Sequence, residues 1–288
     1  MPKIPLLTIP KKYRSQSRDT SIEVDFLQCS IWKQMPLIKK VELTVSITQG
    51  CRQLTLQGIK NKYPQFTPQE QKLFYTKIIL GEEISSLIID RKKDENIMIG
   101  NPIELALLIA EILESLDIVY FVEGSVASSL WGESRATLDL DLVADLKVEK
   151  IDNFIAKVDP LFYLSEEAVK QAIINKSCFN LIHFFTSEKI DIFIPNQSSL
   201  IQTEIERRTL QTVTENGSYL YLATPEDIIL QKLIWYRDGN KISERQWRDV
   251  LGVLKVQSTD LDFNYLKYWA ELENLSDLLN QALLESGL

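Results

Sequence analysis

Residues 118–142 read IVYFVEGSVASSLWGESRATLDLDL, and this stretch decides the fold class. A strongly β-forming run over 118–122 ends in Gly124-Ser125, and a second strand is predicted over 138–144 after a short helix. A strand that turns through glycine into a helix and is followed by another strand is typical of layered α/β structure. We therefore predict a mixed sheet flanked by helices.

Helices and strands are expected on both sides of this stretch. Ahead of it, Asn101-Pro102-Ile103-Glu104 has the residue types of a helix N-terminus, and that helix is expected to run to about Leu116. Beyond it we expect helices near 147–158, 165–175, 198–209 and 225–239, strands over 178–185 and 189–194, a strand pair at 211–214 and 218–222, and helices through the last fifty residues.

The first third of the chain has a helical pattern. Apolar residues fall at helical spacing between 20 and 81, and Thr67-Pro68-Gln69-Glu70 followed by Gly81 supplies a cap at each end of one helix. Residues 1–19 have the composition of a mobile basic arm, and residues 91–96 that of a linker. The expected class is α/β, with a small basic all-α domain over 1–93 and a mixed-sheet domain with C-terminal helices over 94–288.

Bulk composition excludes several classes of protein. The chain has 288 residues, of which 45% are hydrophobic and 25% charged, as in ordinary globular proteins. Its longest apolar run, Ile103–Leu116, is broken by three glutamates, so neither a membrane span nor a membrane partner is expected. The N-terminus has no signal-peptide pattern, and three widely spaced cysteines indicate reduced thiols. We therefore expect a cytoplasmic protein.

Net charge differs sharply between the two predicted domains. The whole chain carries −8, made up of +8 in residues 1–93 and −16 in residues 94–288. Such asymmetry indicates two units with different electrostatic roles. The basic unit either docks against the acidic one or leaves a positive surface for an anionic acceptor such as RNA.

Three aspartates stand at predicted strand positions. Asp139 and Asp141 are two residues apart and therefore share one face of their strand. Asp191 interrupts an otherwise apolar strand, where an unpaired charge is costly. Carboxylates this close need a cation, and their oxygens suit Mg²⁺. The alternatives are a solvated strand face for the first two and a salt bridge or edge position for the third. The neighbouring residues expected in the core are Leu138, Leu140 and Leu142.

Gly124-Ser125 has the residue types of an anion site. Glycine lets the backbone approach a ligand closely, and the free N–H groups of the following helix attract negative charge. Arg135, Lys232 and Arg237 are cations that could neutralise a triphosphate, although each could equally be a solvated surface residue, Arg237 above all.

Taken together, these features resemble the DNA polymerase β-like nucleotidyltransferase superfamily. Its motif is Gly-Gly or Gly-Ser after a strand, a short gap, Asp-x-Asp on the next strand and a third carboxylate on a neighbouring strand. Here residues 126–138 fill the gap, and the resemblance covers about 101–288. The segments that most resemble the bacterial AbiEii-like branch are Gly124-Ser125, the run 135–141, Thr224-Pro225-Glu226-Asp227 with Lys232, and Trp247-Arg248-Asp249-Val250.

The resemblance implies both an activity and a site. A member of this family would transfer a nucleotidyl group from an NTP to an RNA, protein or small-molecule acceptor, using two Mg²⁺ ions. Several AbiEii-like proteins are toxins, so an antitoxin protein is an implied partner. The implied catalytic and metal-binding residues are Asp139, Asp141 and Asp191, and the implied nucleotide- and phosphate-binding residues are Gly124, Ser125, Arg135, Lys232 and Asp249.

Several alternatives stay open. Asp249 could instead pair with Arg245 or Arg248 on the surface. Glu123 adds a negative charge beside the expected phosphate site, and this charge weakens triphosphate binding unless the side chain points away. The fold could also serve as a catalytically silent binding or regulatory module, although three acids around one site favour turnover.

The single histidine and the tryptophans are expected to be structural. His183 lies five residues from Cys178 on one predicted strand, so the two side chains point to opposite faces and cannot form a nucleophile–base pair. A packed, hydrogen-bonded histidine is expected there. The tryptophans expected in the core are Trp131, Trp235, Trp247 and Trp269.

Overall fold

The structure is a computed structural model that describes residues 12–82, 84–85 and 99–288. Most of the basic arm and the whole of the linker predicted at 91–96 lie outside the described residues. The domain boundary placed after residue 93 lies outside them as well.

The described part of the basic segment includes the helices α1 (Ile22–Gln34), α2 (Leu37–Lys62) and α3 (Pro68–Leu80). The capping pattern predicted for α3 is confirmed, because Thr67 and Glu70 each bond to the other's backbone N–H, which satisfies two donors at the helix start. Gly81 ends α3 with φ +84°, a conformation that glycine adopts at little cost.

A seven-stranded mixed sheet follows, in the order β3-β4-β5-β2-β1-β7-β6. The two central neighbours of the motif, β2 and β5, run parallel, and β1 lies antiparallel on the other side of β2. The two-residue β3 was missed, since a strand that short has no alternation to detect. The strands are β1 (Tyr120–Glu123), β2 (Asp139–Ala144), β3 (Phe162–Tyr163), β4 (Cys178–His183), β5 (Lys189–Phe193), β6 (Thr209–Thr212) and β7 (Tyr219–Leu222).

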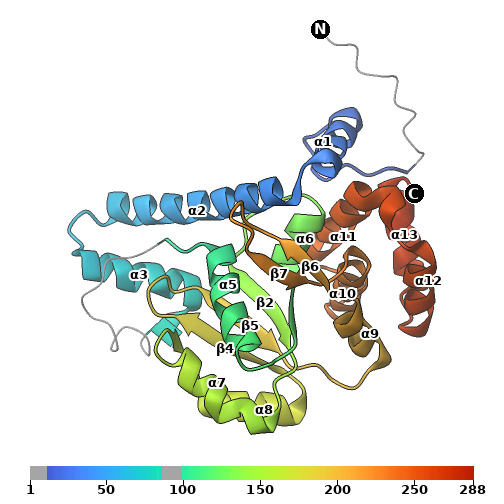
Figure 1. The fold of residues 1–288 in the computed structure, drawn as a ribbon. Coiled ribbons are helices and arrows are strands. Elements are labelled where there is room, and N and C mark those ends of the chain that lie inside the picture. The colour runs from blue at the N-terminus through green and yellow to red at the C-terminus, as the bar shows by residue number, and fades with distance from the viewer. Residues whose placement is uncertain (1–11, 83, 86–98) are drawn as a thin grey trace.

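Helices cover both faces of the sheet, as predicted for the α/β class (Figure 1). One face buries Val122, Leu140 and Ile192 against α5 (Pro102–Glu114), α7 (Ile151–Val158) and α8 (Glu166–Asn175). The other buries Phe121 and Val143 against the C-terminal helices. The remaining helices are α6 (Gly124–Trp131), α9 (Ser199–Arg207), α10 (Pro225–Asp238), α11 (Glu244–Gln257), α12 (Phe263–Leu272), α13 (Ser276–Ser286) and the short 3₁₀ turns Val148–Lys150 and Ser258–Asp260.

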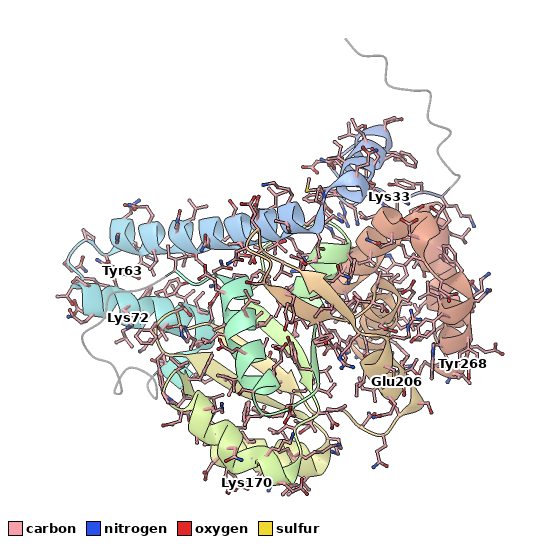
Figure 2. All side chains as sticks on the ribbon, in the orientation of Figure 1. Lys33, Tyr63, Lys72, Lys170, Glu206 and Tyr268 are labelled. Carbon is pink, nitrogen blue, oxygen red and sulfur yellow. The ribbon has the colours of Figure 1, made fainter. Side chains whose placement is uncertain are left out.

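The basic helices dock onto the rest of the chain. Arg52 of α2 forms a buried ion pair with Glu188 in the turn between β4 and β5. Lys255 of α11 reaches Asp25 of α1 at 2.9 Å, also buried. Lys33, labelled in Figure 2 near the start of α2, lies 3.2 Å from an Asp260 carboxylate oxygen. Opposite charges on the basic helices and on the rest of the chain therefore pair with each other within the protein.

Two expectations about the core need correction. Leu138 is 57% exposed, because β2 begins one residue later at Asp139 and the preceding loop turns this side chain outward. Leu140 and Leu142 are buried, as predicted. Trp131 and Trp235 are only partly buried; Trp131 still packs against the core, whereas Trp235 lines a cavity.

No described helix is long and apolar enough to span a membrane.

Candidate active site

Four polar side chains lie in one row across the sheet, on the face covered by the C-terminal helices. Asp141 of β2 is the register partner of Glu123 on β1 and of Asp191 on β5, and Asp191 is in turn the partner of Asn180 on β4. Register partners share a face, so all four side chains point the same way. Asp139 lies two residues before Asp141 and belongs to the same face, which we call the acid face.

Two residues of the acid face, Lys189 and Asn180, were not assigned by sequence reasoning. Lys189 is the register partner of Asp139, and its ammonium lies 2.7 Å from Asp191 and 3.7 Å from Asp139. Asn180 donates its side-chain amide to Asp191. Lys189 could have been found from its spacing of two residues before Asp191, but the position of Asn180 depends on strand pairing. The salt-bridge alternative for Asp191 is therefore present in the structure.

Gly124 and Ser125 lie directly against the acid face. Gly124 has φ +63°, and a Cβ atom there would lie 1.9 Å from the nearer carboxylate oxygen of Asp141. The Ser125 amide donates to that carboxylate at 3.3 Å. Strand β1 thus passes into α6 through a left-handed glycine that only just clears Asp141, and the Gly-Ser pair and the Asp-x-Asp pair form one site.

Two of the three cations considered for the triphosphate, Arg135 and Lys232, converge on Asp249, whereas Arg237 pairs with Asp238. Arg135 donates two hydrogen bonds to the Asp249 carboxylate, at 2.8 and 2.7 Å, and a third to the Ser125 hydroxyl at 3.0 Å. Lys232 lies 3.0 Å from the same carboxylate. Burial works against the charge on Asp249, yet these two cations hold its pKa below the ordinary value. Asp249 therefore pairs with Arg135 and Lys232, and not with Arg245 or Arg248.

Burial raises the pKa of both Glu123 and Asp141. Burial and the neighbouring Asp141 charge raise the pKa of Glu123 to about 8. Burial and the charge of Asp139 raise the pKa of Asp141 to about 6. This raised pKa favours the protonated form of Glu123 at neutral pH in the metal-free protein, which lessens the negative charge expected beside the phosphate site.

We expect Glu123→Gln to change how stability depends on pH. The folded protein holds a proton on Glu123 between pH 4.5, the ordinary pKa, and about 8. Because the folded state binds the extra proton, this group makes the free energy of unfolding fall as pH rises through that range, by roughly 1.4 kcal/mol for each unit of pKa shift. Urea unfolding from pH 5 to 8.5 should show a shallower decline for the variant than for the native chain. Parallel curves would contradict the buried, neutral state.

The acid face suits Mg²⁺ in its chemistry. Its carboxylate oxygens are the ligands that Mg²⁺ prefers, and their mutual repulsion is already partly relieved by a cation, the Lys189 ammonium between Asp139 and Asp191. As the side chains stand, no set of three or more His, Cys, Asp or Glu residues in the described ranges forms a ready metal cage. A metal ion would therefore have to draw Asp191 away from Lys189 and Asn180.

The single histidine is placed outside this site. His183 lies on β4, five residues from Cys178, and its Nδ1 is 2.9 Å from the Thr186 hydroxyl. Of these two residues, only Cys178 lies on the acid face, because it is two residues before Asn180. The prediction that these two residues form no catalytic pair agrees with this geometry.

Solved structures similar to this chain include nucleotidyltransferases and nucleotidyltransferase-like proteins. An antigenic nucleotidyltransferase-like protein from Paracoccidioides brasiliensis is 21% identical, with a TM-score of 0.42 over 65% of this chain and 93% of that one. The antibiotic-resistance factor ANT(2'')-Ia is 15% identical, with a TM-score of 0.39 over 62% of this chain and 96% of its own. The lincosamide antibiotic adenylyltransferase LnuA is 14% identical, with a TM-score of 0.35 over 56% of this chain and 99% of its own.

No protein-family model and no curated protein matches the chain. The likeness to solved structures concerns the fold alone, so the chemistry has to be argued from the residues of this chain. Membership of the AbiEii-like branch stays a prediction.

Proposed function

We propose that the protein is a Mg²⁺-dependent nucleotidyltransferase that moves a nucleotidyl group from an NTP to an acceptor hydroxyl. The observation that carries this proposal is the contact between the two halves of the motif. Asp141, with Asp139 and Asp191 on the same face, packs against the Gly124-Ser125 turn at the start of α6. Anion-binding backbone and cation-binding carboxylates thus meet at one place.

Each residue has a distinct role in this proposal. The N-terminus of α6, with the Ser125 hydroxyl, binds the terminal phosphates of the nucleotide. Arg135 already contacts Ser125 and is held by Asp249, so its guanidinium is oriented toward those phosphates before the nucleotide arrives. Lys232, buried beside Asp249, adds a fixed positive charge.

Asp139, Asp141 and Asp191 would hold the Mg²⁺ ions, which lower the pKa of the attacking hydroxyl and neutralise charge on the leaving group. In the transfer, the acceptor oxygen forms a bond to the α-phosphorus and the bond to the bridging oxygen breaks. Pyrophosphate leaves with that oxygen, and the hydroxyl proton passes to solvent.

The direct test is transfer of label from α-³²P NTPs, one base at a time, into acceptors in a cell extract with Mg²⁺. Labelled product with one or more of the four nucleotides is the expected result. A catalytically silent module, the competing function, would bind NTP and leave it intact with every extract fraction.

Binding of an RNA acceptor by the basic helices stays a prediction. Its test uses the cations that are exposed and not those that pair within the chain. Arg14, Lys33 and Arg52 are engaged in ion pairs with the rest of the chain. Lys60 and Lys62 are exposed at the far end of α2, beside Tyr63 in Figure 2.

If these lysines contact RNA, Lys60→Glu combined with Lys62→Glu should weaken binding of a single-stranded RNA. The slope of log affinity against log salt should become shallower by about 0.7 for each lost phosphate contact. The measurement is fluorescence anisotropy across a salt series. Identical affinities and slopes in the native and variant chains would mean that the basic segment serves docking alone.

A further inference from the structure

A cavity of about 530 Å³ adjoins the acid face. Its floor includes Val143 and Phe193, which are register partners. Each lies two residues after an aspartate of the acid face, Asp141 or Asp191, and so points to the same face. Its walls come from α9 and α10. Cavities of this size hold small organic molecules, and a molecule seated here would have the proposed catalytic carboxylates at its edge.

One side of the cavity is apolar and aromatic. The rings of Phe193 and Trp235 stack at 6.2 Å between centroids, and Ile201 and Ile234 extend the apolar wall. Exposed aromatic surface in a concave site favours a ligand with a flat or apolar face.

The other side offers hydrogen-bond acceptors. Glu123 lines the cavity and is only 4% exposed. A carboxyl group in so enclosed a position favours a ligand that donates a hydrogen bond to it. Gln231 and Glu273 also line the cavity, the latter half-buried.

The cations that line this cavity differ from those on the Arg135 side of the site. The smaller cavity beside Ser128, of about 290 Å³, has three arginines in its lining, Arg135, Arg245 and Arg248, together with three acids. The larger cavity has no arginine, and its only cation is Lys176, outnumbered by Glu273 together with the aspartates of the adjoining acid face. Guanidinium groups bind phosphate oxygens in pairs, whereas a wall of carboxyl groups repels anions.

Resting on the proposed function, we propose that the larger cavity is the acceptor site. It takes a small, neutral or positively charged molecule with an aromatic or apolar face. That face packs on Trp235, and a hydroxyl or amine of the molecule donates to Glu123. A nucleic-acid acceptor does not fit this lining, because its phosphates would meet carboxyl groups without arginine.

Three small phenols with side chains of similar size and different charge test the chemistry of the cavity: tyramine (positive), tyrosol (neutral) and 4-hydroxyphenylacetate (negative). Binding is measured by isothermal titration on the full chain, without NTP or Mg²⁺. We expect tyramine to bind about tenfold or more tightly than 4-hydroxyphenylacetate, with tyrosol between them. Trp235→Ala should weaken tyramine about tenfold, since it removes the aromatic wall.

The matched control is Tyr268→Ala. Tyr268 is a 59% exposed aromatic residue on the outer side of α12, outside the cavity (Figure 2). This variant should bind tyramine like the native chain. Glu273→Gln, a nearly isosteric change at a half-buried site, is the second variant in case Trp235→Ala does not fold. It should reduce the difference in affinity between tyramine and 4-hydroxyphenylacetate.

Equal binding of the three phenols, or tyramine binding that neither Trp235→Ala nor Glu273→Gln changes, would overturn the proposal. So would competition of adenosine or uridine with tyramine, because the cavity would then seat the nucleobase. The proposed function fails separately: its failure is the absence of labelled transfer, which none of these titrations measures.

Discussion

Asp139→Asn is expected to lower the rate of nucleotidyl transfer about a thousandfold or more while leaving the fold intact. The asparagine side chain has nearly the same shape, but it lacks the negative charge that a metal ligand supplies. Asp139 is also the most accessible of the three aspartates, and its nearest cation, the Lys189 ammonium, is 3.7 Å away. Exposed ion pairs of that kind contribute about 0–1 kcal/mol to stability, so little stability depends on this charge.

The measurement pairs the initial rate of labelled transfer with urea unfolding in the absence of metal. Asp145→Asn is the matched control, because Asp145 directly follows the other end of β2 and pairs with Lys147 at 2.7 Å. The control should keep its activity. A metal-free free energy of unfolding that drops by several kcal/mol in Asp139→Asn would show that this residue is a structural member of an ion pair and not a ligand.

Gly124→Ala is expected to reduce both activity and stability. A residue other than glycine at φ +63° is strained by about 1–3 kcal/mol. In addition, the new methyl group would lie 1.9 Å from an Asp141 carboxylate oxygen, so either the turn or Asp141 must move. Because the proposed chemistry needs Asp141 and Ser125 in contact, displacement of either residue removes transfer as well.

Gly217→Ala is the control that separates backbone strain from the steric clash with Asp141. Gly217 has φ +88° in the turn between β6 and β7, and a Cβ there meets no atom within 4 Å. Both variants should lose stability through backbone strain, and Gly124→Ala should lose more and also lose activity. Thermal unfolding and labelled transfer on the two variants give the comparison. Equal losses of stability with activity retained in both would mean that the close approach of Gly124 to Asp141 has no role in the site.

Sequence alone determined the elements and the local chemistry of the motif. Caps such as Thr67 with Glu70 act within one helical turn, so residue types and spacing are enough to place them. The two-residue repeat of a strand likewise requires Asp139 and Asp141 to share a face, whatever lies beside them. The prediction failed at Leu138, where the alternation was extended one residue beyond the start of β2.

Only the tertiary structure decided what these residues meet. The pairing of β2 with β5 sets Asp141 opposite Asp191, and it also brings the unassigned Lys189 between Asp139 and Asp191. The contact from Arg135 to Asp249 joins residues 114 positions apart, which no local pattern encodes. The raised pKa of Glu123 likewise depends on burial by elements distant in the chain. Local signals determine which face a side chain takes, whereas strand register and burial arise from contacts between remote segments, and these completed the candidate site.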